Sequence, residues 1–250
     1  MSDLKLNYRV EGDGEPLLLV HGFGISFNIW KNLIPLLRPH FTLVMIEAPG
    51  IGGSPFEKNG RSYLAASVEA IECLRTKLGF DSWNVLGYST GSRIAEAYGG
   101  AYVSRVRGLI FLCPLVLPRF TNLNLRISLW VDKFIPAYGD FILTGWRLKF
   151  LILLLGFSLK QNPLAGEWFD EISQNPRNVL KETLRMVAPV GTRPFDVPKS
   201  ALHIWGRDDF VTQKPRKPGP HDFFIYANHA APMLAADEVS ELIIKLLGNS

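Results

Sequence analysis

A glycine-flanked serine between a short apolar run and a helix-like segment constrains the fold of this chain most strongly. The run from Asn84 to Leu86 enters Gly87-Tyr88-Ser89-Thr90-Gly91, and a helix-like segment from Ile94 to Tyr98 follows. In a strand–turn–helix this tight, the residues two before and two after the serine nearly touch, so both must be glycine. The turn lifts the Ser89 hydroxyl toward the N–H groups that begin the helix. The pattern predicts a nucleophilic serine, with a plain helix N-cap as the alternative.

Apolar runs alternate with helical patterns through the first half of the chain. A half-exposed strand, in which Leu4, Leu6, Tyr8 and Val10 alternate with polar residues, is followed by a wholly apolar run at 17–20 and by largely apolar runs at 42–46 and 108–113. Such runs are typical of strands covered on both faces. Helical spacing appears over 27–37 and over a segment that begins near Ser62 and stops at Gly79. This alternation predicts an α/β fold with a doubly wound, mostly parallel sheet.

The alternation breaks after Pro114 and resumes at Ala201. From 117 to 198 the chain is helix-like and rich in Leu, Phe, Trp and Pro, whereas strand patterns return at 201–205 and 223–226, before a closing helix over 238–247. We therefore expect a core of residues 1–116 and 199–250 with a helical cap inserted at 117–198. Within the cap, the uncharged run around 150–157 is about ten residues long, and a membrane span needs about 20. A buried cap helix is expected there, without a membrane span.

Composition excludes several classes of protein. Hydrophobic residues make up 47% of the 250 residues and charged residues 20%, which favours a large core over disorder. The net charge is only +4, and the basic residues are scattered except at 214–217, so we expect no nucleic-acid partner. Cys73 and Cys113 do not suggest a disulfide framework. The first residues lack the apolar stretch of a signal peptide, and the cytoplasm is the expected location.

Short motifs at the ends of predicted strands resemble those of the α/β-hydrolase superfamily, in the subgroup with a helical cap inserted after the sixth strand. They are His21-Gly22, the segments 49–54 and 87–91, Gly206-Arg207-Asp208-Asp209 and Asn228-His229. The resemblance covers the whole chain and implies a serine esterase whose triad runs Ser, acid, His along the sequence. The chain departs from most relatives in having room for only one strand before Leu17, and from many in having Glu47 in place of Asp.

The resemblance implies Ser89 as nucleophile, Asp209 as acid and His229 as base. A base must accept the serine proton, and a carboxylate must fix the imidazole tautomer. His203, within a strand, and His221, in a proline-rich loop, are the competing histidines. Asp208 is the competing acid, and the family's Gly-x-x-Asp spacing favours Asp209.

The resemblance also implies an oxyanion hole. The backbone N–H of Thr90, which follows the nucleophile, and that of Phe23, in the H-G-x turn, would be its donors. His21 is expected to hold this turn rather than to react, and Cys113 to be a small buried filler rather than a reactive thiol. Three prolines within 211–220 make the helix that usually joins acid and histidine unlikely to form, so a solvated basic loop is expected.

Together these observations predict a serine hydrolase that cleaves a small-to-medium, largely apolar carboxylic ester through an acyl-enzyme, without metal or organic cofactor. The cap is expected to supply the substrate pocket, and five of its aromatic residues are candidates either for the pocket lining or for the core of the cap: Trp130, Phe134, Phe141, Trp146 and Phe150. The same triad serves thioesterases, lactonases and C–C bond hydrolases or lyases, which the fold cannot separate. A slow-turnover ligand receptor on the same scaffold is a further alternative.

Overall fold

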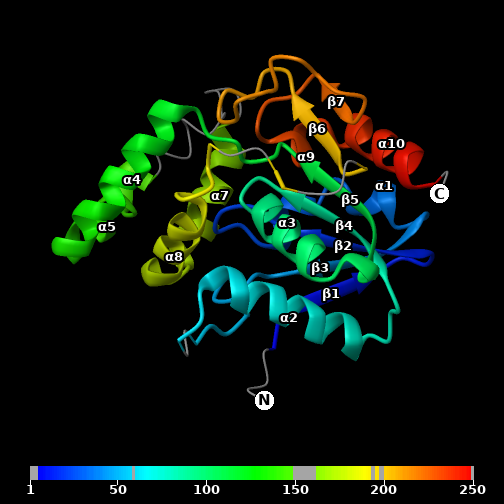
Figure 1. Cartoon of the computed structure of the whole chain (residues 1–250), viewed down its shortest axis with the longest axis horizontal. Helices are drawn as coiled ribbons and strands as arrows, with labels where there is room; N and C mark the ends of the chain where they lie inside the picture. The colour runs from blue at the N-terminus through cyan, green and yellow to red at the C-terminus, as the bar shows by residue number, and fades with distance from the viewer. Residues whose placement is uncertain (1–4, 58–59, 149–161, 193–194, 197–199, 249–250) are drawn as a thin grey trace.

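The computed structural model contains a seven-stranded sheet with the strand order β1-β3-β2-β4-β5-β6-β7 within the described part of the chain. That part comprises residues 5–57, 60–148, 162–192, 195–196 and 200–248 (Figure 1). β1 pairs with β3 in antiparallel fashion, and every other pair of neighbours is parallel. The strands are β1 (Tyr8–Glu11), β2 (Glu15–Val20), β3 (Phe41–Ile46), β4 (Trp83–Tyr88), β5 (Val106–Leu112), β6 (Leu202–Gly206) and β7 (Asp222–Ile225).

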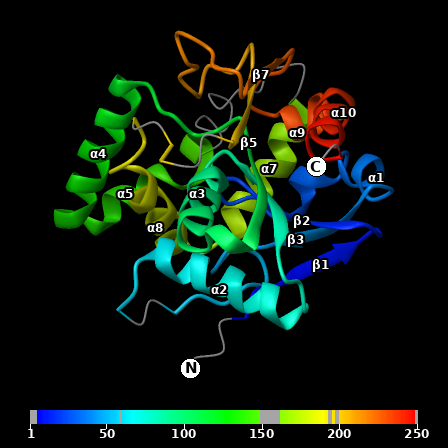
Figure 2. The same ribbon diagram turned by 45° about the vertical axis from the view of Figure 1, so that its right-hand side comes forward.

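Helices cover both faces of the sheet. One face carries α2 (Tyr63–Lys77) and α3 (Gly91–Ala101), and the other carries α1 (Ile34–Leu37), α9 (Ala231–Leu234) and α10 (Ala236–Leu247) (Figures 1 and 2). Short 3₁₀ turns, η1 (Phe27–Trp30) and η2 (Val103–Arg105), complete this part. Every residue of β4 is buried, as the apolar runs predict for strands covered on both faces. The prediction of a doubly wound, mostly parallel sheet is confirmed.

Local sequence signals account for both ends of α2. The side chain of Ser62 accepts a hydrogen bond from the N–H of Ala65 and so caps α2, and Gly79 follows the helix with a φ of +75°. The helical spacing over 27–37 predicted one helix, but two short elements form instead, η1 and α1. Pro35 lies in the first turn of α1, and it cannot donate the N–H that a continuous helix would need there.

All elements described between β5 and β6 are helices, and they form the inserted cap. They are α4 (Arg119–Phe134), α5 (Pro136–Ile142), α7 (Asn162–Gln174) and α8 (Arg177–Val187). The cap lies beside the sheet in Figure 1, with α4 and α5 at its outer edge. The buried helix expected over 150–157 falls outside the described residues. Among the residues described, no helix combines the length and the hydropathy needed to cross a bilayer.

Two polar side chains of α7 and the turn after it attach the cap to the core. Asn175 donates to the carbonyl of Gly24 and accepts from the N–H of Gly52, at distances of 2.7 and 3.0 Å. Glu171 accepts from both the N–H and the hydroxyl of Ser26. These contacts reach the loops that follow β2 and β3, so the cap is anchored where two parallel strands end.

Candidate active site

The turn after β4 presents Ser89 in a backbone conformation that side chains rarely adopt. Ser89 has a φ of +52°, and it lies between the last residue of β4 and the first turn of α3. A Cβ at Gly87 would lie 2.7 Å from the carbonyl oxygen of Gly91, and one at Gly91 would lie 2.3 Å from that of His21. The close approach that the sequence predicted therefore leaves no room for a side chain at either position.

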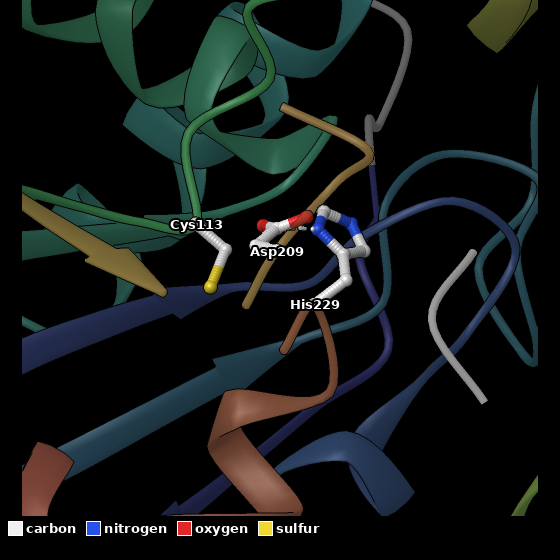
Figure 3. A group of neighbouring side chains, drawn as sticks. All are labelled: Cys113, Asp209 and His229. Atoms are coloured by element: carbon white, nitrogen blue, oxygen red, sulfur yellow. Dashed lines mark hydrogen bonds and ion pairs between the residues drawn. The ribbon is translucent and has the colours of Figure 1, made fainter. Parts of the chain in front are cut away.

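Ser89, His229 and Asp209 form a hydrogen-bonded chain. The Oγ of Ser89 is 2.8 Å from Nε2 of His229. On the other side of the ring, Nδ1 of His229 is 2.8 Å from Oδ2 of Asp209, and Figure 3 shows this second contact. All three side chains are buried. Burial by itself would raise the pKa of Asp209, but the charge and hydrogen bond of His229 outweigh it and keep that pKa below its ordinary value. An ionised Asp209 can thus orient the ring and leave Nε2 to face the serine.

The loop after β6 holds Asp209 by contacts that the sequence analysis did not foresee. Oδ1 of Asp209 accepts the N–H of Val211 at 2.9 Å, Oδ2 lies 3.3 Å from the hydroxyl of Thr212, and the ammonium of Lys214 donates to the main-chain carbonyl of Asp209. The neighbouring Asp208 is exposed. The first of these contacts is an Asx turn, in which an Asp side chain accepts the N–H two residues later. The sequence signal that could have predicted it is an Asp two positions before Val211. No helix forms over 211–220, as the prolines predicted, and the start of this loop supports the acid.

Tyr88 is a second residue that the sequence analysis missed. Its hydroxyl donates a hydrogen bond of 2.7 Å to the carbonyl oxygen of His229, and the two rings lie 5.5 Å apart. Burial raises the pKa of Tyr88 well above its ordinary value, so the hydroxyl stays a donor. This contact holds the loop that carries His229 against the end of β4, the central strand of the sheet. Nothing in the sequence signals it, because 141 positions separate the two residues.

The other histidines occupy different places. Nδ1 of His21 lies 2.7 Å from the carbonyl of Gly22, and Nε2 accepts the N–H of Ala48. Burial lowers the pKa of His21, which favours the neutral ring that these contacts require, and the side chain joins the turn after β2 to the loop after β3. His203 lies half-buried on β6 with Nδ1 3.8 Å from Asp222, and His221 immediately precedes β7.

The two predicted oxyanion donors flank the serine. Phe23 lies in the turn after β2, Thr90 follows Ser89, and both line the same cavity as Ser89 and His229. Within the described part of the chain, neither backbone N–H donates a hydrogen bond to another protein group. These donors are therefore available to an oxygen atom placed above Ser89.

Cys113 lies beside Asp209 and His229. Its Sγ, a carboxylate oxygen of Asp209 and a ring nitrogen of His229 all lie within 4.8 Å of one another (Figure 3). Burial, followed by the nearby charge of Asp209, raises the pKa of the Cys113 thiol well above its ordinary value, which opposes a reactive thiolate. Both ring nitrogens of His229 are engaged, one by Ser89 and one by Asp209. This group therefore does not suit a metal, which would need one of those nitrogens.

A largely apolar cavity of about 320 Å³ connects the serine to the cap. Ser89, Thr90 and His229 lie on its wall together with apolar side chains of the cap and the loops before it: Leu115, Leu117, Leu125, Leu129, Ile142, Leu143, Leu184 and Val187. Asp132 and Lys181 add a buried ion pair of 2.8 Å.

The cap aromatic residues that were candidates for the cavity lining or for the core of the cap occupy neither place where they are described. Trp130, Phe134, Phe141 and Trp146 are all exposed and none lines the cavity, while Phe150 falls outside the described residues. The apolar wall of the cavity consists mainly of leucines, together with two other aromatic residues, Phe23 and Tyr138.

Comparison with known proteins identifies the fold family. Residues 15–141 match the family described as alpha/beta hydrolase fold. Pimeloyl-[acyl-carrier protein] methyl ester esterase from Photobacterium profundum is 30% identical, over 82% of this chain and 80% of its own length. The identity is 24% to 2-hydroxy-6-oxo-6-phenylhexa-2,4-dienoate hydrolase from Comamonas testosteroni, over 84% of this chain and 76% of that protein. Other matches are partial: those to abhd-5.2 of Caenorhabditis elegans and to a fluoroacetate dehalogenase of Burkholderia sp span 23% and 32% of those proteins.

Among solved structures, a hydrolase from Oleispira antarctica aligns with a TM-score of 0.79 at 21% sequence identity, over 99% of this chain and 96% of that one. At this identity the likeness concerns the fold, which extends through the cap as well as the sheet.

Proposed function

Because the chain belongs to the alpha/beta hydrolase fold family, we propose that it is a serine hydrolase that cleaves small-to-medium, largely apolar carboxylic esters. One observation carries the proposal: the hydrogen-bonded chain from Ser89 through His229 to Asp209 at the wall of an apolar cavity. Serine is a poor nucleophile until a base accepts its proton, and the 2.8 Å contact supplies that base. The cytoplasmic location stays a prediction.

In the proposed reaction, Nε2 of His229 takes the proton of Ser89 as Oγ attacks the ester carbonyl. The oxygen that becomes negative meets the N–H groups of Phe23 and Thr90, each worth about 3–4 kcal/mol in such sites. The tetrahedral intermediate collapses, the alcohol leaves with the proton from His229, and an acyl-serine remains. A water molecule, deprotonated by the same ring, then attacks the acyl group and restores Ser89. Asp209 stabilises the imidazolium in both halves of the reaction.

We propose that the segment 117–198 is a cap that holds the acyl chain. The leucines named above give the cavity an apolar wall on α4, α5 and α8, while the serine lies at the edge of the sheet. Burial of each methylene of an acyl chain there is worth about 0.8 kcal/mol. The cavity wall beyond the ion pair of Asp132 and Lys181 supplies few polar groups, which supports an apolar acyl group over a charged one.

The ester assignment is tested with a panel of p-nitrophenyl esters, acyl thioesters and lactones of graded chain length, assayed on the wild type and on Ser89→Ala. Esters are expected to give the highest kcat/KM, and Ser89→Ala is expected to lose up to about a millionfold in kcat, by analogy with a serine protease. Ser173→Ala, which removes a hydroxyl from the exposed end of α7, is the matched control and should retain full activity. A preference for thioesters or lactones would reassign the substrate, and a folded but inactive wild type that binds acyl ligands would favour the receptor alternative.

A further inference from the structure

The outer side of α4 carries a continuous stripe of exposed apolar side chains. Its members recur at intervals of three and four residues, which places them on one face of the helix, and each is between 51 and 74% exposed. We call the set the outer stripe: Phe120, Leu123, Ile127, Trp130 and Phe134. The rings of Trp130 and Phe134 contact each other edge to face at 5.0 Å. Exposed apolar patches of this kind mark interaction surfaces more often than chance.

This arrangement inverts the usual polarity of a surface helix. The two fully buried residues of α4 are polar, Asn122 and Asp132, and its most exposed large side chains are apolar, although Leu125 and Leu129 line the cavity. At 3.6 residues per turn, the outer stripe lies roughly 150° around the helix from the residues that line the cavity. Thus α4 separates the acyl cavity on one side from an uncovered apolar face on the other. In both views α4 lies at the outer margin of the cap, away from α10 (Figures 1 and 2).

A row of positive charges runs beside the outer stripe. Arg119, Arg126 and Lys133, which we call the basic flank, are exposed and recur every seven residues, each one position before a residue of the stripe. Asp132 is the single acidic residue of α4, and it pairs with Lys181 and Arg185 on the inner side. The outer surface of α4 therefore combines aromatic side chains with unopposed positive charge.

A second group of exposed aromatic residues with an arginine lies in α5 and just after it. The side chains of Phe141 and Trp146 are exposed, and the guanidinium of Arg147 lies 3.5 Å from the centre of the Phe141 ring and 5.4 Å from that of Trp146. Aromatic rings next to Arg or Lys are suited to the boundary between acyl chains and charged headgroups.

We propose that the outer face of α4 docks on the surface of an anionic lipid bilayer. The outer stripe would enter the boundary between headgroups and acyl chains, and the basic flank would contact the lipid phosphates and carboxylates. The helix would lie in the plane of the membrane and would not cross it. Docking in this orientation places the cavity on the inner side of the same helix, one helix diameter from the lipid.

Charge complementarity favours a bilayer over a second copy of this chain. In a two-fold contact between two α4 helices, each basic flank would meet either the other basic flank or a side of α4 without acidic residues, because Asp132 lies on the inner side. The net charge of +4 adds to the attraction toward anionic lipid and to the repulsion between copies.

Sedimentation with vesicles tests the proposal directly. Wild-type protein is expected to bind vesicles of phosphatidylcholine and phosphatidylserine, to bind pure phosphatidylcholine much less, and to be released by salt. Phe120→Ser/Trp130→Ser should weaken binding about tenfold or more. The matched control, Val103→Ser/Tyr226→Ser, removes two equally exposed apolar side chains elsewhere and should bind as the wild type does. Ser89→Ala should also bind normally, which separates docking from hydrolysis.

Two charge-reversal variants with the same change in net charge test the basic flank. Arg126→Glu/Lys133→Glu should abolish the preference for phosphatidylserine, whereas Arg38→Glu/Arg216→Glu, at two other exposed positions, should reduce it only slightly. Equal losses in both pairs would overturn the role of the flank, because net charge alone would then explain binding. Quenching of Trp130 fluorescence by brominated lipid, assigned with Trp130→Phe, should accompany binding.

Two results would overturn the proposal as a whole. One is a wild type that binds neither vesicle type. The other is a wild type that is a dimer without lipid, as measured by light scattering, together with a Phe120→Ser/Trp130→Ser variant that is a monomer. That pair of results would make the outer stripe an interface between copies of the chain. The substituted residues are exposed, so unchanged melting temperatures are expected, and a variant that melts earlier is replaced by Trp130→Ser alone.

Discussion

The hydroxyl of Tyr88, the last residue of β4, donates a hydrogen bond of 2.7 Å to the main-chain carbonyl of His229, in the loop between β7 and α9. The residue before Ser89 thus holds the backbone of His229. Because Tyr88 and Ser89 are adjacent, the end of one strand sets the positions of both Ser89 and His229.

Tyr88→Phe is expected to lower kcat about tenfold and to leave KM nearly unchanged. The change leaves the buried carbonyl of His229 without its donor and loosens the ring relative to Ser89, at a cost of about 1–3 kcal/mol. Steady-state kinetics with a short-chain ester give the split between kcat and KM. A rise in KM with constant kcat would show that Tyr88 contributes to substrate binding and not to positioning of the base.

Asp209→Asn is expected to reduce kcat by about 10⁴, as the corresponding change does in a serine protease, because an amide can fix the wrong imidazole tautomer. Asp208→Asn is the matched control: the side chain is exposed and one position away, so activity should change little. Melting curves of both variants exclude misfolding. If Asp208→Asn were inactive and well folded, the proposed acid would be off by one residue.

Acidification is expected to destabilise the wild type through Asp209. The folded-state pKa of this carboxyl lies below its ordinary value of about 4. Its contribution to stability is therefore present above the unfolded-state pKa and is lost as the pH falls through the folded-state pKa. Melting temperatures measured from about pH 7 to about pH 3 should fall more steeply for the wild type than for Asp209→Asn. Parallel curves would show that Asp209 is not the carboxyl responsible.

Acyl-chain length should affect kcat/KM through the cap. The value should rise by roughly fourfold per methylene, which corresponds to about 0.8 kcal/mol, until the cavity is full. Leu129→Trp places an indole in the cavity and should shorten the optimal chain while leaving acetyl esters nearly unaffected. A flat profile in the wild type would show that the acyl group does not enter this cavity.

The parts of the fold that could be predicted depend on local pattern. The Gly87 and Gly91 spacing predicted the turn because two glycines are required wherever a strand reverses this tightly into a helix. The strands were predicted because a strand that is covered on both faces has apolar side chains at nearly every position, and this gives a short continuous apolar run in the sequence. The motif spacing also selected Asp209 and His229, the residues that lie within hydrogen-bonding distance of each other.

The parts that could not be predicted depend on tertiary position. Helical periodicity in α4 shows that one face is apolar, but it does not say which face meets the cavity, and so Trp130 and Phe134 were expected inside although they lie outside. The support from Tyr88 joins residues 141 positions apart, which no local pattern encodes. The sequence of 211–220 correctly excluded a helix, yet it did not show that Lys214 would hold Asp209.

Fluorophosphonate labelling tests the central claim, that Ser89 is activated by His229 for acyl transfer, most directly. The reagent should add one phosphonyl group per chain, as measured by intact mass, and peptide mapping should locate it on Ser89. Labelling should disappear in Ser89→Ala, fall strongly in His229→Ala, and persist in Ser173→Ala. A modified residue other than Ser89, or undiminished labelling of Ser89→Ala, would contradict the account.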